Sequence, residues 1–283
     1  MPYPETIQQQ LEQVWRSPDM PVLDKLRKTQ FVAHSIPLTA DESTRPGEPL
    51  ISQSPRTIAI HESLQRFMGP DLAGKTALDL GCLEGGLSFE LRRAGLTVLG
   101  VEGRAENYER CLLIRHYYRA LGGLEFAHSD VREFRPARTF DAVVCSGLLY
   151  HLDDPAAYIG ELGRLTSPGG MLYLDTHVAP EDACLASSEY HAWLSGLKTG
   201  TAGGIAIRYR EYSEDISLPE SSIGNTYSVW MDLNSHLELM FDAGFNRIFE
   251  LHGYFGAGEQ ELKQRYCRRY FVALKGTHPP MPQ

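Results

Sequence analysis

The stretch from Thr76 to Gly86 constrains the fold of this chain more than any other segment. Its apolar first half is interrupted by Asp79 and stops at Gly81, a pattern typical of a buried strand that ends in a tight, glycine-rich turn. From Gly86 onward, apolar residues recur at roughly helical spacing. Strand, glycine turn and helix in this order predict a place in an open α/β sheet where backbone N–H groups face a ligand.

Strand-like and helix-like segments alternate after this turn, which predicts a sheet of mostly parallel strands. Further strands are expected over 96–102, 124–130, 140–146 and 170–176, and helices over 105–121 and 155–165. A helix over 233–243 and strands over 247–253 and 266–274 complete the pattern. The predicted fold is α/β and Rossmann-like: a doubly wound, mostly parallel seven-stranded sheet with helices on both faces.

Segments outside this pattern predict the domain organisation. Residues 5–31 suggest two short amphipathic helices, 35–55 an irregular proline-rich connection, and 56–68 a helix. Residues 177–232 are rich in glycine and lack clear regular structure, as inserted lids often do. We therefore expect an N-terminal cap (1–55), a core (56–275) with an inserted lid (177–232), and a short tail (276–283).

Composition limits the partners and the compartment. The formal charge of −9 disfavours a large nucleic-acid interface, and the cluster Lys263, Arg265, Arg268 and Arg269 is expected to be solvated surface. The five cysteines are scattered and predict reduced thiols, with neither a disulfide framework nor a zinc site. No apolar run reaches the roughly 18 residues of a membrane span, so a cytoplasmic protein is expected, with no membrane contact.

Polar side chains stand where successive predicted strands end, and such ends meet at one edge of a parallel sheet. These residues are Asp79, Gly81, Glu102, Asp130, Ser146 and Gly147. An acid after the second strand can accept both hydroxyls of a ribose, and one after the third can accept an exocyclic amine. Together they predict a nucleoside cofactor.

The sequence of the turn distinguishes between two candidate nucleoside cofactors. A dinucleotide site would have glycine at positions 81, 83 and 86, whereas position 83 is Leu83 and Glu84 would face the diphosphate. Asp79 and Glu84 instead suit a ligand with cationic groups. S-adenosyl-L-methionine carries such groups, an ammonium and a sulfonium.

With these motifs the sequence resembles the class I S-adenosylmethionine-dependent methyltransferases over about 74–178, and more loosely over 233–275. The resemblance implies S-adenosyl-L-methionine as cofactor and S-adenosyl-L-homocysteine as product. It assigns cofactor binding to Asp79, Gly81, Leu83, Gly85, Glu102, Gly103, Ser129, Asp130, Val131, Ser146 and Gly147. Arg56, just ahead of the core, is a candidate for the cofactor's carboxylate, with a capping or surface role as the alternative.

Direct displacement of the sulfonium methyl group needs alignment and exclusion of water, and a base only when the attacking atom carries a proton. Tyr150 and His151 follow the fourth strand and His177 follows the fifth, so these three are the catalytic candidates, with Asp175 as a group that could orient His177.

The expected partner is a small-molecule acceptor, such as an amine, an amino acid, a thioether or a hydroxyl compound. No metal is expected, and a homodimer is compatible with the sequence. Candidates for acceptor binding are Trp15, Tyr190, Trp193, Arg208, Tyr209, Arg210, Tyr227 and Trp230.

Three alternatives stay open at this point. The run from Gly147 to Pro155 also resembles tRNA wobble-uridine carboxymethyl-transferring enzymes, although the negative net charge and the lack of a basic arm disfavour tRNA. An NAD-dependent oxidoreductase would need the dinucleotide turn that Leu83 disfavours. A non-catalytic protein that binds S-adenosylmethionine is the third.

Overall fold

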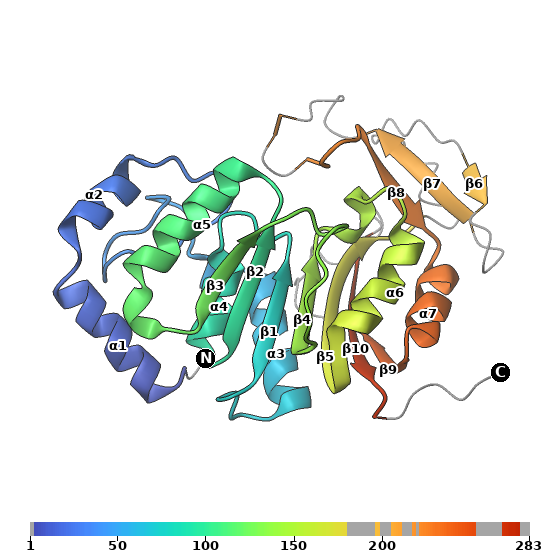
Figure 1. Ribbon diagram of the computed structural model, residues 1–283, viewed down its shortest axis with the longest axis horizontal. Helices are drawn as coiled ribbons and strands as arrows, with labels where there is room; N and C mark the ends of the chain where they lie inside the picture. Colours follow the sequence, from blue (N-terminus) through green and yellow to red (C-terminus); the bar gives the residue numbers. More distant parts are fainter. Residues whose placement is uncertain are drawn as a thin grey trace. The chain divides into compact units, whose positions relative to one another are not determined.

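The computed structural model describes residues 3–179, 196–198, 205–210, 217–218, 221–252 and 268–277, with the backbone alone for 196–198 and 205–210. The chain forms two compact units, Met1–Arg135 and Pro136–Gln283, which are treated one at a time below. Its large sheet has seven strands in the order β3-β2-β1-β4-β5-β10-β9 (Figure 1). The predicted mostly parallel, seven-stranded α/β sheet is therefore confirmed.

Three parallel strands form the centre of the first unit: β1 (Thr76–Leu80), β2 (Thr97–Glu102) and β3 (Leu124–His128). Their register pairs Leu80 with Val101 and Glu102 with His128. The helices α4 (Gly86–Arg93) and α5 (Ala105–Tyr117) follow β1 and β2 and pack on these strands. The carboxyl ends of the strands, with Glu102 among them, consequently meet at one edge.

The N-terminal part of the first unit contains the helices predicted there. They are α1 (Glu5–Arg16), α2 (Met20–Lys28) and α3 (Pro55–Met68), with a short 3₁₀ turn, η1 (Ile51–Gln53), before α3. Asp19 caps α2, because its Oδ1 accepts a hydrogen bond from the backbone N–H of Val22 at 3.3 Å. The apolar side chains Leu11, Leu23 and Leu26 are buried, as the amphipathic pattern requires. The helix expected over 105–121 ends at Tyr117, and a 3₁₀ turn, η2 (Arg119–Leu121), follows it.

The second unit contains the other four strands of the large sheet. The strands β4 (Phe140–Ser146) and β5 (Thr166–His177) are parallel, while β9 (Phe245–Glu250) and β10 (Arg268–Lys275) continue the sheet antiparallel. A 3₁₀ turn, η3 (Leu149–His151), follows β4 and leads to α6 (Pro155–Leu165), and α7 (Leu233–Asp242) precedes β9. The helices α6 and α7 touch where Gly163 faces Ala243, since a Cβ at Gly163 would lie 2.4 Å from the Ala243 carbonyl oxygen.

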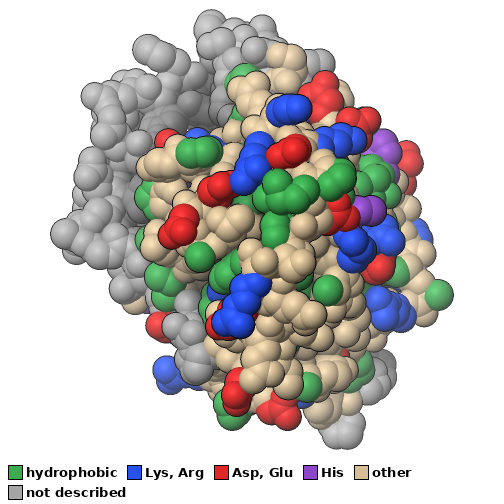
Figure 2. Space-filling view, turned by 90° about the vertical axis from the view of Figure 1, so that its left-hand side faces the viewer, with side chains coloured by type: hydrophobic (Ala, Val, Ile, Leu, Met, Phe, Trp, Pro, Cys, Tyr) green, Lys and Arg blue, Asp and Glu red, His purple; other side chains and the backbone are tan. Residues whose placement is uncertain are grey.

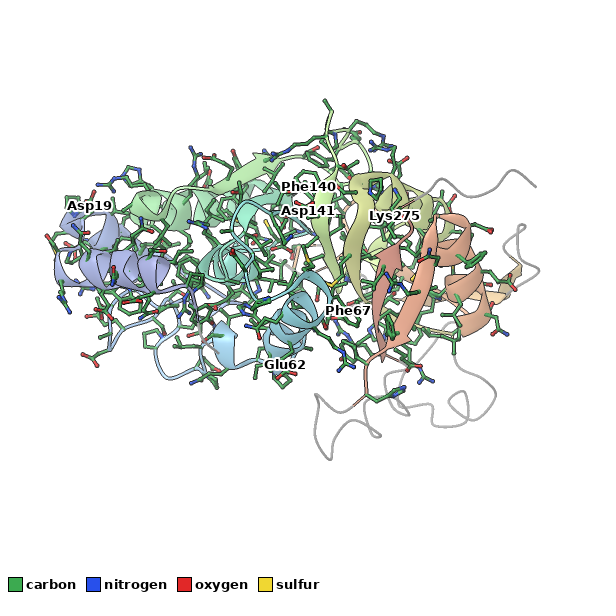
Figure 3. The ribbon with its side chains drawn as sticks, turned by 90° about the horizontal axis from the view of Figure 1, so that it is seen from below. Asp19, Glu62, Phe67, Phe140, Asp141 and Lys275 are labelled. Carbon is green, nitrogen blue, oxygen red and sulfur yellow. The ribbon has the colours of Figure 1, made fainter. Side chains whose placement is uncertain are left out.

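Lys275 binds backbone carbonyl groups at one edge of the second unit. Figure 3 looks onto this edge from below, with Phe140, Asp141 and Lys275 labelled. The ammonium group of Lys275 donates hydrogen bonds to the carbonyl oxygens of Gly163 and Thr166, where α6 ends and β5 begins. This contact satisfies carbonyl groups at the end of α6. The residues expected to act on ligands lie at the opposite ends of β4 and β5.

A second, antiparallel sheet lies within 177–232, where no clear regular structure was predicted. It consists of β6 (Gly196–Lys198), β7 (Ile205–Arg210) and β8 (Tyr227–Met231). The prediction was wrong here because strands this short carry a weak local signal and depend on partners distant in sequence. The small sheet is attached to the end of β5, since the Ala179 N–H donates to the Met231 carbonyl oxygen at 2.7 Å.

Candidate active site

The turn between β1 and α4 has an unusual backbone. Gly81 and Gly85 have φ values of 67° and 78°, and Leu83 has φ of 49°, in the left-handed region that side chains disfavour. The sulfhydryl of Cys111 in α5 donates to the Leu83 carbonyl oxygen at 3.0 Å. A Cβ at Gly85 would lie 2.8 Å from the Phe126 ring, so only glycine fits there. The turn is thus held in one conformation by β3 and α5.

Glu102, at the end of β2, is bonded to this turn. Its Oε2 accepts from the Leu83 N–H at 2.9 Å and its Oε1 from the Arg104 N–H at 2.8 Å. Burial raises the pKa of Glu102, while the two backbone hydrogen bonds and one from the Asn107 side chain act in the opposite direction.

Asp79 lies in β1 and is 2% exposed. Burial raises the pKa of Asp79 to about 7; hydrogen bonds from Ser88 lower it, and the charge of Glu102 adds to the increase. The Ser88 hydroxyl donates to Asp79 Oδ2 at 2.6 Å, and this partner is neutral. A buried carboxyl group with neutral partners would be stabilised in its charged form by a cationic ligand group.

Glu84 does not have the role proposed for it. Its side chain is fully buried, and its carboxylate accepts hydrogen bonds from the backbone N–H groups of Val32, Ala33 and His34 at 2.7 to 3.0 Å. The expectation that Glu84 faces a cationic ligand is therefore wrong, because three donors of the N-terminal segment already bind this carboxylate. The donors lie about 50 residues away in sequence, so no local pattern indicated them.

The residues after β3 form a local cluster. The N–H of Ser129 donates to the Glu102 carbonyl oxygen at 3.0 Å, and Val131 is buried. Asp130 accepts from the guanidinium of Arg132, with 2.6 Å between Arg132 Nη2 and Asp130 Oδ2. Burial would raise the pKa of Asp130, but the hydrogen bonds from Arg132 outweigh burial and lower it. His128 contributes as well, with 3.1 Å between its Nε2 and the carbonyl oxygen of Gly103.

His34 is a site residue that no sequence signal indicated, since it lies at the edge of the irregular proline-rich connection. Its Nδ1 accepts a hydrogen bond from the N–H of Gly86, the first residue of α4, at 3.1 Å. Burial, together with the charges of Arg56 and Arg45, lowers the pKa of His34 to about 4. The predicted cofactor residue Arg56 is therefore close to His34 and to the start of α4.

In the second unit, Asp175 near the end of β5 is fully buried and holds two side chains. The guanidinium of Arg268 binds it at 2.6 and 2.9 Å, and the Ser146 hydroxyl donates to it at 3.0 Å. Burial alone would lower the pKa of Arg268, but the charge of Asp175 raises it above its ordinary value. The expectation that Arg268 belongs to a solvated surface cluster is thus wrong. Lys263 and Arg265 lie outside the described residues, and Arg269 pairs with Glu250 at 2.9 Å.

The three catalytic candidates gather in the second unit. The Tyr150 ring lies 4.3 Å from the ring of His151 and 4.4 Å from that of His177, measured between centroids. His177 stacks on Trp230 of β8 at 4.6 Å, with the planes 8° apart. These four residues, called the aromatic cluster below, come from η3, the end of β5 and β8.

Two residues of 221–226 hold His151 and its turn. The Nδ1 atom of His151 lies 3.1 Å from the hydroxyl oxygen of the buried Ser222. The amide of Asn225 donates to the His151 carbonyl oxygen at 3.2 Å and to Asp153 Oδ1 at 2.5 Å. Ser222 and Asn225 thus fix the ring and the backbone of His151 in the turn after β4.

The remaining acceptor candidates are placed as follows. Trp15 donates from its indole N–H to the Tyr118 hydroxyl at 3.3 Å, just past the C-terminal end of α5. Tyr227 and Trp230 lie in β8. The side chains of Arg208, Tyr209 and Arg210, and the whole of Tyr190 and Trp193, lie outside the described residues.

The first unit fits S-adenosylmethionine better than a dinucleotide. Asp79 is a buried carboxyl group with a raised pKa, and a cationic ligand group beside it would favour its ionised form. The carboxylate of Glu102 lies beside the glycine turn. No group of three His, Cys, Asp or Glu side chains within the described ranges is placed to hold a metal ion. Among the same residues, no helix has the length and apolar character needed to cross a membrane.

Comparison with known proteins supports this fit. A family model described as a methyltransferase domain matches residues 52–248. The chain is similar to the ubiquinone biosynthesis O-methyltransferases of Psychrobacter cryohalolentis, at 36% identity over 107 residues, and of Aromatoleum aromaticum, at 33% over 107 residues. Each alignment covers 37% of this chain and 42% or 45% of the relative, so the chain matches less than half of these proteins.

Solved structures extend the likeness over the whole fold. The N-terminal domain of EvdMO1, crystallised in the presence of S-adenosylhomocysteine and D-fucose, has 25% identity and a TM-score of 0.61, covering 91% of this chain and 97% of that domain. The magnesium protoporphyrin IX methyltransferase of Synechocystis PCC 6803, with bound S-adenosylhomocysteine, shares the fold at 16% identity and a TM-score of 0.52, covering 96% and 100%. The match over residues 52–248 includes the glycine turn, Glu102 and Asp130. The chain therefore belongs to the methyltransferase-domain family, in the class I S-adenosyl-L-methionine-dependent group.

Proposed function

We propose that this enzyme methylates a hydroxyl group of a small-molecule acceptor, with the aromatic cluster as the acceptor site and His151 as the proton acceptor. The observation that carries the proposal is the convergence of Tyr150, His151 and His177 with Trp230, from three separate elements. Stacked aromatic rings present apolar faces suited to a ring-shaped acceptor and exclude water from it.

The chemistry follows from the residues of the cluster. When bound, the cofactor supplies a methyl group on a positively charged sulfur. As the acceptor oxygen forms its bond to that methyl carbon and the carbon–sulfur bond breaks, the hydroxyl proton must leave. His151 can take this proton at Nε2 in the tautomer whose Nδ1–H donates to Ser222 Oγ, because Nε2 carries no proton in that tautomer.

The names of similar proteins are compatible with an oxygen acceptor. The curated relatives are named O-methyltransferases, and D-fucose, present in the crystals of the EvdMO1 domain, carries several hydroxyl groups. A tRNA acceptor has less support. The chain has a net charge of −9, and the face seen in Figure 2 intersperses basic with acidic side chains over the described residues.

A methyl-transfer screen read by product mass tests the proposal. The panel contains phenols and catechols, sugars with free hydroxyls, amines, amino acids, thioethers and unmodified tRNA. We expect a mass increase of one methylene unit on a phenol or a sugar, on oxygen as assigned by NMR. Methylation of amines, thioethers or tRNA alone would refute the hydroxyl acceptor. Methylation of hydroxyl compounds that is unaffected by His151→Ala would refute the role of His151.

A further inference from the structure

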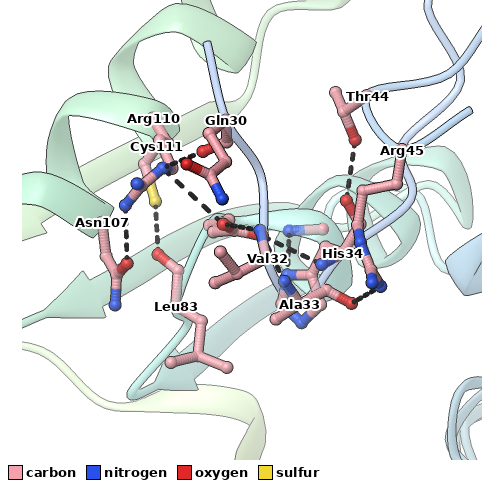
Figure 4. A network of polar contacts seen from close by, with 12 residues as sticks. Gln30, Val32, Ala33, His34, Thr44, Arg45, Leu83, Asn107, Arg110 and Cys111 are labelled. Carbon is pink, nitrogen blue, oxygen red and sulfur yellow. Dashed lines mark hydrogen bonds and ion pairs between the residues drawn. The ribbon is translucent and has the colours of Figure 1, made fainter. Parts of the chain in front are cut away.

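The segment of residues 30–35, named the clasp here, contacts the cofactor turn from outside the matched methyltransferase domain, which begins at residue 52. Figure 4 shows this network, with Gln30, Val32, Ala33, His34 and Leu83 among the labelled residues. Four hydrogen bonds join the two segments, and they run in both directions. Three backbone N–H groups of the clasp donate to Glu84 of the turn, and His34 accepts from Gly86.

These bonds are held in place from both sides. On the clasp side, the Thr44 hydroxyl donates to the His34 carbonyl oxygen at 2.7 Å, and Arg45 donates to that of Ala33 at 3.2 Å. From α5, Arg110 donates to the Gln30 carbonyl oxygen at 2.7 Å and lies 3.7 Å from Glu84 Oε1. The clasp is therefore held by three hydrogen bonds that do not involve the turn, which allows it to position the turn.

Two features of the cofactor turn require support from outside it: the backbone conformation of Leu83 and the glycine at the N-cap of α4. Leu83 has a positive φ, which costs a non-glycine residue free energy and persists only where the surroundings hold it. The N-cap position of α4 is Gly85, which has no side chain to accept from the helix N–H groups. The imidazole of His34 supplies an acceptor there instead. A Cβ on Gly86 would lie 2.7 Å from the His34 Cβ, so the two residues are in direct contact.

We propose that the clasp is part of the cofactor site and that His34 is its positioning residue, holding the turn and the first residue of α4 in the binding conformation through Nδ1. The proposal rests on the cofactor assignment and is independent of the acceptor. The charged groups that face the clasp histidine are Arg56 of α3, Arg45 of the following loop and Glu84 of the turn. The two arginines disfavour a charged imidazole, which keeps Nδ1 available as an acceptor.

The test measures S-adenosylhomocysteine binding by calorimetry at pH 7.5. His34→Ala should weaken binding by about tenfold or more, because the turn loses its acceptor at the start of α4. His34→Asn should restore affinity to within about threefold, since the asparagine Oδ1 occupies the place of the histidine Nδ1 and accepts a hydrogen bond. In turnover assays, His34→Ala should raise KM for S-adenosylmethionine and leave kcat at saturating cofactor near its original value.

Controls separate a specific role from general damage. His116→Ala alters a histidine of α5 whose side chain is 58% exposed, and it should leave affinity unchanged. Wild-type affinity in His34→Ala, or a His34→Asn protein as weak as His34→Ala, would overturn the proposal. If the unaltered protein fails to bind S-adenosylhomocysteine, the cofactor assignment falls and this inference with it; if only the variants behave unexpectedly, the inference falls alone.

Hydrogen exchange on the unaltered protein decides the matter if His34→Ala does not fold. Saturating S-adenosylhomocysteine should slow exchange of the Val32, Ala33 and His34 amides, whose hydrogens bind Glu84, together with that of Gly86. Peptides from α6 serve as the internal reference. Unchanged exchange of the clasp at saturation would overturn the proposal as well.

Discussion

The hydroxyl group of Ser88 donates a hydrogen bond to the carboxyl group of Asp79, with 2.6 Å between Oγ and Oδ2. The two residues lie on consecutive elements, β1 and α4, and both are buried. The pair joins the two sides of the cofactor turn beneath its glycines. Because burial disfavours the charged form more than the Ser88 hydrogen bond favours it, the pKa of Asp79 is raised and the carboxyl group retains its proton to a much higher pH than an exposed aspartate.

Asp79 should therefore make the stability of the protein depend on pH. Its pKa is about 7 in the folded protein against an ordinary value of 3.8, so between these values the folded state binds more protons than the unfolded state. The free energy of unfolding should consequently fall as pH rises from about 4 to 7, by roughly 4 kcal/mol at most from this group. Asp79→Asn should remove that fall.

Urea denaturation at pH 5 and pH 8 measures the effect. His34 acts in the opposite sense: its pKa is lowered from 6.5 to about 4, so its contribution to stability is lost as pH falls through this range. It is common to both proteins, and the difference between wild type and Asp79→Asn isolates Asp79. Equal changes in both proteins between the two pH values would contradict the assignment.

Glu102 should be essential for cofactor affinity. Its carboxylate binds the N–H of Leu83 and faces the site expected to hold the ribose. Glu102→Ala should weaken S-adenosylhomocysteine binding by about 10- to 100-fold, which corresponds to the loss of hydrogen bonds to a charged group. Glu125→Ala, in the neighbouring strand β3 with its side chain 59% exposed, is the matched control. Equal affinities in the two variants would exclude this role.

The bidentate pair of Arg268 and Asp175 should be important for stability. Arg268→Met would leave the fully buried Asp175 without its counter-ion, at a cost of about 3 to 5 kcal/mol in the free energy of unfolding. The neighbouring Arg269→Met removes one partner of Glu250, whose side chain is 22% exposed, and should cost about 1 kcal/mol or less. Similar losses from both substitutions in denaturant titrations would count against a special place for Arg268.

Two glycines of α6 offer a test of helix packing. A Cβ at Gly163 would lie 2.4 Å from the carbonyl oxygen of Ala243, so Gly163→Ala should push α7 away and destabilise the protein by about 1 to 3 kcal/mol. Gly160 has open space around its Cα, and Gly160→Ala should be neutral or stabilise by up to about 1 kcal/mol. In thermal unfolding, the melting temperature should fall for Gly163→Ala and should rise or stay unchanged for Gly160→Ala.

His151 should control turnover more than binding. If it takes the proton of a hydroxyl acceptor, His151→Gln should lower kcat by about 100-fold or more with little change in KM for S-adenosylmethionine. Ser222→Ala should have a smaller effect in the same direction, because it frees the Nδ1 side of the ring and leaves the tautomer unfixed. A wild-type kcat in His151→Gln, measured with the acceptor identified by the screen, would eliminate His151 as the base.

Local signals were sufficient to predict much of the fold. The helix over 155–165 was placed correctly because Pro155 suits a first helical position and Asp154 caps the helix, accepting from the Ala157 N–H at 2.9 Å. The strand over 140–146 matches β4 to the residue, since the apolar run from Ala142 to Cys145 ends abruptly in Ser146 and Gly147. These features depend on residues a few positions apart.

Contacts between distant residues account for what the sequence did not reveal. Glu84 and the clasp are about 50 residues apart, and Arg268 and Asp175 are 93 apart. In each case a charged residue that a one-dimensional pattern would assign to a ligand or to solvent is buried against a partner elsewhere in the fold. The small sheet of β6, β7 and β8 escaped prediction for the same reason, since its strands stabilise one another across loops.

The hydrogen bonds to Glu84 also bear on where this protein can be divided. A fragment trimmed to the matched region, from residue 52 onward, would retain the complete glycine turn and strip a buried carboxylate of its three backbone donors. We therefore expect a fragment that begins at residue 52 to be less stable towards denaturant than the intact chain, because Glu84 would lose these donors.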